Sequence, residues 1–354
     1  MIINNKPFLI GETAFHHQGD ISYLRKLVEA GLGAGVDTIK VHLLFDLDDY
    51  FIEDHKAYGA LAEMLISHTD FEQLHKDFSK RSVRPIYLCN DVASLRWVNS
   101  LPVDSVLAIE LHASGINDVF LLEEACKFSG TVILGSGGSS IEDLYYAIAY
   151  LRDKSKNDIL LMHGFQNYPT NYKEIIFSKM HKLQQIFNLP VGYADHTDPQ
   201  DSMNVYISCL PQAFGFNVLE KHFTIDPNER RVDSQSAVTL DQLQQIRSMM
   251  DNLALACGTD PLSMSFAERK YGDTGPIKKA IVAKRDLTEG HLITIDDVAF
   301  KRTNGSIPVK QKELNLIIGS RVKAAIRKDT PLTFDNIQYV FREAENEQFF
   351  ISKG

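Results

Sequence analysis

Short apolar runs alternate with longer amphipathic segments over roughly the first 260 residues of the chain. Most of the apolar runs end in polar or ionisable residues, as buried parallel strands do when they carry functional side chains at their C-terminal ends. We predict eight strands, near residues 8–12, 38–42, 85–89, 105–111, 131–135, 158–163, 190–197 and 217–224. Helices are predicted between and after them, near 20–34, 70–81, 91–100, 118–128, 139–153, 172–187, 200–214 and 239–257.

Eight strand–helix units in about 250 residues match the size of a (β/α)8 TIM barrel. A doubly wound open sheet is the alternative. The first predicted strand is followed by Glu12-Thr-Ala-Phe-His-His-Gln18, which is not a glycine-rich dinucleotide fingerprint. We therefore predict an α/β barrel over residues 1–260.

The pattern changes near residue 260. Residues 261–278 are mainly polar and end in glycine and proline, as linkers do. The short apolar runs of residues 279–341 are separated by turn signals and predict a small, mainly β domain. Residues 342–354 form a charged tail.

Composition narrows the possible partners and compartments. The chain has 354 residues, 44% of them hydrophobic, and a formal net charge of -9, so it lacks the basic footprint of a nucleic-acid binder. No run approaches the ~20 apolar residues that cross a bilayer, and the N-terminus lacks the apolar core of a signal peptide. The four cysteines have no metal-type or redox spacing. We predict a cytoplasmic protein that acts on small molecules, without nucleic-acid or membrane partners.

Two of the predicted strands end in histidine. One ends in Asp195, His196 and Thr197, and the other carries Glu220 and His222. If these strands are neighbours, the two imidazoles meet at one rim of the sheet, where they suit a divalent transition metal. The alternative is a pair of hydrogen-bonded histidines that only close the strands. Ionisable residues gather at the ends of nearly all the strands, and buried charge is costly unless it is paired. This favours a functional site.

Several stretches then resemble the sialic acid synthase family, over nearly the whole chain. Asp195-His-Thr197 and Glu220-Lys-His-Phe-Thr224 are similar to the family's D-H-T and E-[RK]-H-F-T motifs, and Tyr168-Pro-Thr170 matches its Y-P-T. Glu12-Thr-Ala-Phe-His-His-Gln-Gly19 looks like its E-[IV]-[GA]-x-N-H-x-G opening. Lys301-Arg-Thr-Asn-Gly305 is similar to a turn of the family's C-terminal antifreeze-like (SAF) domain.

The resemblance implies condensation of phosphoenolpyruvate with an open-chain N-acylhexosamine, which yields a nonulosonic 2-keto acid and phosphate. It implies Mn²⁺ or Mg²⁺ on His196 and His222, and a domain-swapped homodimer in which Arg302 reaches the partner's site. Glu12, Lys40 and Asp195 are the predicted catalytic residues, with Lys40 contacting phosphoenolpyruvate. The predicted substrate-binding residues are His16, His17, Ser114, Ser136, Gln166, Tyr168, Thr197, Glu220, Asp233 and Arg302.

The chain also departs from the family pattern. Leu111 stands where the motif on the fourth strand has lysine, and Ala194 replaces the serine before D-H-T. Such positions would contact the substrates, so these departures indicate a divergent member with a changed acceptor. The alternatives are a barrel enzyme with another donor and a catalytically silent sugar-binding relative.

Overall fold

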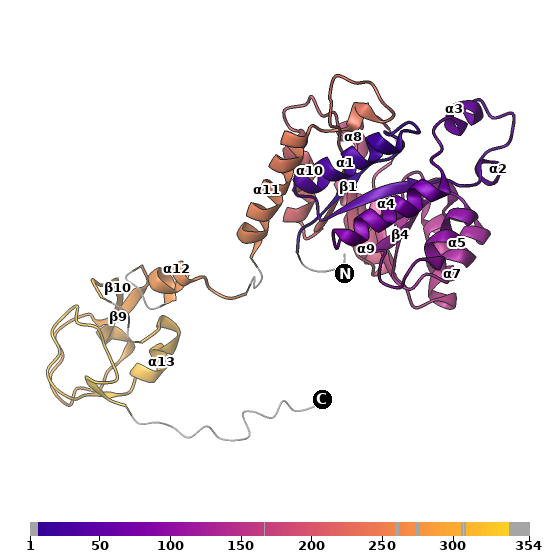
Figure 1. The fold of residues 1–354 in the computed structure, drawn as a ribbon. Coiled ribbons are helices and arrows are strands. Elements are labelled where there is room, and N and C mark those ends of the chain that lie inside the picture. The colour runs from indigo at the N-terminus through magenta and orange to yellow at the C-terminus, as the bar shows by residue number, and fades with distance from the viewer. Residues whose placement is uncertain are drawn as a thin grey trace. The chain divides into compact units, whose positions relative to one another are not determined.

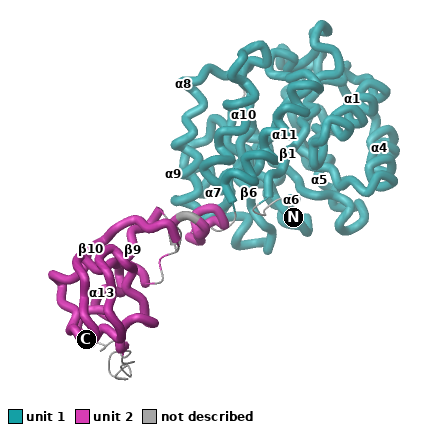
Figure 2. The backbone as a smooth tube through the Cα atoms, turned by 90° about the vertical axis from the view of Figure 1, so that its left-hand side faces the viewer, with its two compact units in different colours: residues 1–258 teal, residues 259–354 magenta. Residues whose placement is uncertain are grey.

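The computed structural model describes residues 6–165, 167–258, 262–273, 277–305, 307 and 309–339 (Figure 1). The chain divides into two compact units, residues 1–258 and residues 259–354 (Figure 2). Each unit has its own hydrophobic core.

The first unit is a closed barrel of eight parallel strands in sequential order, which confirms the predicted fold class. The strands are β1 Phe8–Glu12, β2 Thr38–Leu43, β3 Ile86–Cys89, β4 Ala108–Leu111, β5 Thr131–Gly135, β6 Asp158–His163, β7 Val191–Asp195 and β8 Val218–His222. The barrel closes by pairing of β1 with β8, in which Glu12 lies opposite His222.

Helices surround the barrel in Figure 1. They are α1 Ile21–Gly33, α2 Leu47–Tyr50, α3 Tyr58–Ala62, α4 His68–Lys80, α5 Val92–Ser100, α6 Val119–Ala125, α7 Ile141–Lys154, α8 Tyr172–Ile175, α9 Phe177–Phe187, α10 Asn204–Ala213 and α11 Leu240–Cys257. Small polar residues begin many of them: Ser140 caps α7 in a reciprocal capping box with Asp143, near the helix start that the sequence predicted.

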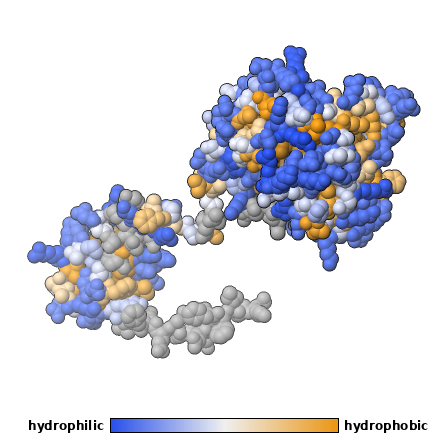
Figure 3. All heavy atoms as spheres, viewed as in Figure 1, coloured by the Kyte–Doolittle hydropathy of each residue, from blue (hydrophilic) through white to orange (hydrophobic). Residues whose placement is uncertain are grey.

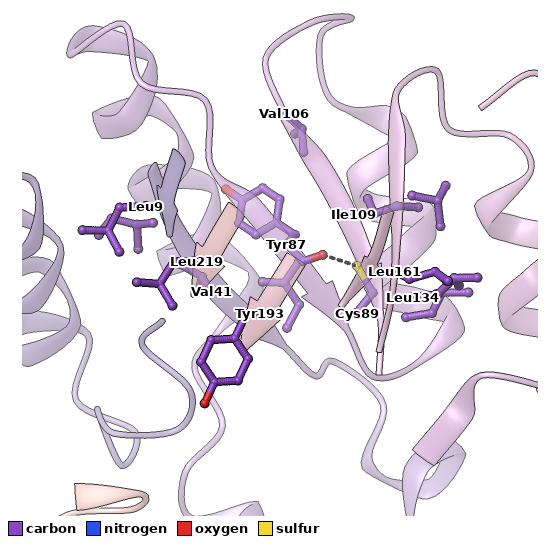
Figure 4. Packing of buried hydrophobic residues seen from close by; sticks show 14 of the residues in the cluster. Leu9, Val41, Tyr87, Cys89, Val106, Ile109, Leu134, Leu161, Tyr193 and Leu219 are labelled. Carbon is purple, nitrogen blue, oxygen red and sulfur yellow. Dashed lines mark hydrogen bonds between the residues drawn. The ribbon is translucent and has the colours of Figure 1, made fainter. Parts of the chain in front are cut away.

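The two faces of the strands carry different cores. Outward-facing side chains such as Leu9, Val41, Ile109 and Leu161 pack against the helices in a large hydrophobic cluster (Figure 4). A second, smaller apolar cluster fills the barrel interior. Its residues alternate along the strands with the outward-facing ones. They are Ile10, Ile86, Ala108, Ile133, Leu160, Met162, Ala194 and Val218. Because side chains alternate along a strand, residues two positions further on continue the inner face toward the C-terminal ends.

Two local differences from the predicted helices have physical explanations. The predicted helix 172–187 is broken at Ile176, whose φ of 49° is left-handed, so α8 ends before it and α9 begins after it. The two short helices α2 and α3, which project from the barrel after β2 in Figure 1, were not predicted. They have four and five residues, too few for a helical period to be recognised.

The second unit is small and mainly β. Its strands are β9 Lys279–Ala283, β10 Val298–Arg302, β11 Arg321–Val322 and β12 Ile337–Gln338, which form two antiparallel pairs. Helix α13 spans Leu314–Ile317, and the short helix α12, Phe266–Glu268, lies within the predicted linker. The predicted charged tail lies outside the described residues.

Hydrophilic residues cover much of the visible surface of both units (Figure 3). Within the part of the chain that the structure describes, no helix is both long enough and apolar enough to cross a membrane.

Candidate active site

A cavity of about 720 Å³ lies at the C-terminal ends of the barrel strands. This is the end at which TIM barrels carry their active sites. Residues of the segment between β2 and α4 line it as well, including Tyr50, Phe51, Leu61 and Met64. Polar side chains on or after the strands line it: Glu12, Lys40, His42, Asn90, Glu110, His112, Ser114, Tyr168, His196, Glu220, His222 and Asp233.

Lys40 lies at the centre of three carboxylates. Its Nζ is 2.7 Å from Glu12 Oε2, 2.9 Å from Glu110 Oε2 and 2.7 Å from Glu220 Oε2. Strand register explains the first contact, because Glu12 of β1 is the partner of Lys40 on β2. An ammonium group has three N–H donors. Of the three carboxylates, that of Glu110 accepts a hydrogen bond from Nζ, and the three together exceed the charge of the ammonium.

Burial makes this charge balance important. The side chains of Lys40 and the three glutamates are each at most 5% exposed. Burial alone would lower the pKa of Lys40, but the carboxylates of Glu110 and Glu220 raise it above its usual value, so the ammonium stays charged. Burial and the neighbouring Glu110 raise the pKa of Glu220 to about 7, against the opposing effect of Lys40.

His196 and His222 come together as predicted. Their ring centroids are 5.0 Å apart, and both side chains are buried. Burial lowers the pKa of His196 to about 3 and that of His222 well below its usual value, so both imidazoles are neutral. Neutral imidazole is the form that binds a metal. His196 Nδ1 is buried without a hydrogen-bond partner among the described residues.

Other predicted residues also lie at this cavity. The Tyr168 ring stands edge-on to both histidines, at centroid distances of 5.0 Å to His196 and 5.9 Å to His222. Ser114 Oγ is 2.8 Å from Nδ1 of His112. Asp233 also lines the cavity, and burial raises its pKa to about 6.

Three predicted substrate-binding residues lie behind the cavity wall. His16 is held between the carbonyl oxygen of Val232 at 2.8 Å and Thr224 Oγ1 at 3.1 Å. His17 Nδ1 accepts a hydrogen bond from the backbone of Gly19, and Ser136 Oγ donates one to the carbonyl of Met162. None of the three lines the cavity among the described residues.

Asp195 and Thr197 also differ from their predicted place. Asp195 is fully buried on the outer face of β7, where its carboxylate is 2.6 Å from Nζ of Lys221 on β8. It also accepts hydrogen bonds from Tyr193, Ser208 and both donors of Thr197. Alternation explains the difference, since Ala194 and His196 on either side face the cavity. This network fixes the chain on both sides of His196.

Two further predicted residues lie outside the described part of the barrel. Gln166 lies outside the described residues. Arg302 is at the end of β10 in the second unit, whose placement relative to the barrel is not defined.

Glu110 is the main residue that the motifs missed. On the fourth strand the motif comparison pointed to Leu111, which stands where the family has lysine. Leu111 instead packs on the outer face of the strand in the large hydrophobic core. Glu110 has the same parity as Ala108 in the barrel interior and His112 in the cavity lining. The alternation of β4 was therefore a signal that could have identified it.

Comparison with known proteins gives matches over most of the chain. The NeuB family model matches residues 27–261, and the SAF domain model matches residues 278–338, which confirms the predicted type of the second domain. An uncharacterized protein of Methanocaldococcus jannaschii is 28% identical over 333 residues, which cover 93% of this chain and 94% of that protein. The N,N'-diacetyllegionaminic acid synthase of Campylobacter jejuni is 24% identical and covers 87% of this chain and 94% of its own.

Solved structures share the fold. Spore coat polysaccharide biosynthesis protein spsE of Bacillus subtilis aligns with a TM-score of 0.62 at 21% identity, over 96% of this chain and 99% of that one. N-acetylneuraminic acid synthetase of Leptospira borgpetersenii aligns with a TM-score of 0.67 at 21% identity, over 75% of this chain and 90% of that one.

Proposed function

The chain belongs to the NeuB family, as its motifs predicted, and we propose that it condenses phosphoenolpyruvate with an aldehyde sugar of the N-acylhexosamine type. The products would be a nonulosonic 2-keto acid and phosphate. In this reaction C3 of phosphoenolpyruvate bonds to the aldehyde carbon, and water replaces phosphate at C2. The attacking water gives up both protons, one to the aldehyde oxygen and one to the departing phosphate, and its oxygen becomes the C2 keto oxygen, so the reaction balances.

The observation that carries the proposal is the histidine pair beside the buried Lys40 cluster. Lys40 is the one ammonium group among the described residues that line the cavity, so it is the natural contact for an anionic donor. The neutral rings of His196 and His222 could hold a metal ion that binds the aldehyde, which is the electrophile of the reaction. The relatives named for legionaminic, pseudaminic and neuraminic acids support a donor and acceptor of these classes.

The two histidines fit a divalent metal of the Mn²⁺ or Mg²⁺ type. They are neutral and adjacent, and His196 Nδ1 has no competing partner among the described residues. Within those residues, no group of three or more histidine, cysteine or acidic side chains is arranged to hold a metal, so water or substrate would fill the remaining positions. A bound metal would supply Lewis acidity to a carbonyl oxygen.

The other residues then take supporting roles. Glu12 and Glu220 would orient the Lys40 ammonium through their contacts of 2.7 Å. Tyr168 would keep the two imidazoles in place by packing against both rings. Asp195 and Thr197 would position His196 from outside the cavity. We also propose a homodimer in which Arg302 completes the site of the partner subunit.

One observation favours a second candidate, a barrel enzyme with a changed donor or acceptor. Four carboxylates, those of Glu12, Glu110, Glu220 and Asp233, line the cavity against a single ammonium. Such an excess opposes a multiply charged anion. Phosphate release from phosphoenolpyruvate separates the first candidate from an enzyme with a changed donor, because such an enzyme would release none; an enzyme with a changed acceptor would release phosphate only with an aldehyde outside the N-acylhexosamine class.

A further inference from the structure

Glu110 is paired with Lys40, whose ammonium group is the one among the described cavity-lining residues that an anionic donor could contact. Its Oε2 accepts a hydrogen bond from Lys40 Nζ at 2.9 Å, and its side chain is 4% exposed. Glu12 Oε2 and Glu220 Oε2 each lie 2.7 Å from the same Nζ, so three buried carboxylates crowd the ammonium. An incoming phosphate or carboxylate must therefore displace one of the three to reach the ammonium.

Glu110 is the carboxylate that competes most directly for the ammonium, because it accepts the hydrogen bond from Lys40 Nζ. Glu12 is held from a second direction, since its Oε1 accepts the backbone N–H of Ala14 at 2.7 Å. Glu110 on β4 and Glu220 on β8 both reach Lys40 from strands that do not pair with β2, but Glu220 Oε2 has no hydrogen-bond partner among the described residues, whereas Glu110 accepts a hydrogen bond from Nζ.

The other groups facing this cluster do not supply a second cation. His42 on β2, His112 after β4 and the pair His196 and His222 are all held neutral by burial. Arginine is absent from the described cavity lining, and Lys221 faces outward to Asp195. Among the described residues, Glu110 and an anionic ligand would therefore compete for Lys40 alone, because no other positive side chain lines the cavity.

We propose that Glu110 is a specificity-determining residue that competes with the anionic donor for the Lys40 ammonium, so that the donor binds by displacing Glu110 from Lys40. The proposal deepens the function proposed above, because it concerns the donor subsite of the same cavity. It makes the anion affinity of the wild-type protein weaker than the lysine alone would give. It also makes this side of the cavity selective for a ligand that can break the Lys40–Glu110 contact.

The test measures phosphoenolpyruvate binding by isothermal titration calorimetry at pH 8, without an aldehyde substrate. In Glu110→Gln the shape of the side chain is kept and its charge is removed, so the affinity should rise on the order of tenfold or more, because hydrogen bonds to charged groups are the strong ones. Glu110→Ala should move the affinity in the same direction. Thermal unfolding of each variant shows whether the barrel is intact.

Asp233→Asn is the matched control. It removes one carboxylate from the same cavity, but among the described residues Asp233 forms no ion pair with Lys40, whereas Glu110 lies 2.9 Å from its Nζ. It should strengthen phosphoenolpyruvate binding by less than about threefold, because the only change is the loss of one negative charge at a distance from Lys40. An equal gain in Asp233→Asn and Glu110→Gln would overturn the proposal in favour of a general charge effect.

No gain in folded Glu110→Gln or Glu110→Ala would overturn it as well. The donor assignment fails on a different result, the absence of phosphate release by the wild-type protein with any aldehyde sugar. Binding and turnover are measured separately, so the two failures can be told apart.

Discussion

Replacing Asp195 by asparagine should destabilise the barrel while leaving the cavity chemistry largely in place. The carboxylate and its partner Lys221 are both fully buried and lie 2.6 Å apart. Asparagine leaves the ammonium of Lys221 without a counter-ion, and its amide also places N–H donors among the donors of Lys221, Ser208 and Thr197. Breaking one partner of a buried ion pair costs roughly 3–5 kcal/mol.

That loss is large enough to measure by thermal unfolding. For a domain of this size each kcal/mol shifts Tm by about 2–4 °C, so we expect a fall of roughly 6–20 °C at pH 7. Burial alone would raise the pKa of Asp195, but Lys221 and the hydrogen bonds outweigh it and lower the pKa below its usual value. The stabilisation is therefore present above the usual aspartate pKa and is lost as pH falls through the lower folded value. The difference between wild type and Asp195→Asn should shrink in the same acid range.

Asp198→Asn is the control, because Asp198 is exposed in the following turn and accepts one hydrogen bond from the backbone of Gln200. Its stability should stay within about 0.5 kcal/mol of wild type. At a temperature where Asp195→Asn remains folded, its KM for phosphoenolpyruvate should change only a few-fold. An unchanged Tm together with a large loss of kcat would refute this reasoning and would make Asp195 a catalytic residue.

Two further predictions concern the metal and the assembly. His222→Ala should retain less than about a tenth of the Mn²⁺ that wild type retains after dialysis, because one imidazole alone is a weak site; equal metal content by elemental analysis would exclude His222 as a ligand. If Arg302 completes the cavity of the partner subunit, mixing Arg302→Ala chains with His196→Ala chains should restore part of the activity that neither variant has alone. A protein that is monomeric at micromolar concentration, or full activity of Arg302→Ala, would contradict this.

The barrel could be predicted from sequence because each strand is an apolar run with a polar end. The histidine pair could be predicted for the same reason, since His196 directly follows β7 and His222 ends the neighbouring strand β8. Asp195 shows the limit of that argument: a residue at a strand end faces the cavity or the helices according to its parity. Its strand is buried on both faces, so hydrophobicity does not reveal which face is which.

Glu110 could not be recognised from motifs, because it precedes the position at which the fourth-strand motif has lysine. Only the strand parity, together with the fold, brings it to within 2.9 Å of Lys40. His16 and His17 show the reverse case. They follow the first strand in a motif that suggested substrate contact, yet the turn directs their rings toward Thr224 and Gly19. Side-chain direction in a tight turn depends on backbone angles, such as the left-handed Ala14 and Gln18, that sequence pattern does not specify.

Phosphate release is the most direct test of the proposed function. The wild-type protein is incubated with phosphoenolpyruvate and a panel of N-acylhexosamines, with and without Mn²⁺, and inorganic phosphate and 2-keto acid are measured together. We expect equal amounts of the two products with at least one sugar, only when both the sugar and the metal are present. Absence of phosphate release with every sugar, from a folded protein that binds Mn²⁺, would contradict the proposed condensation.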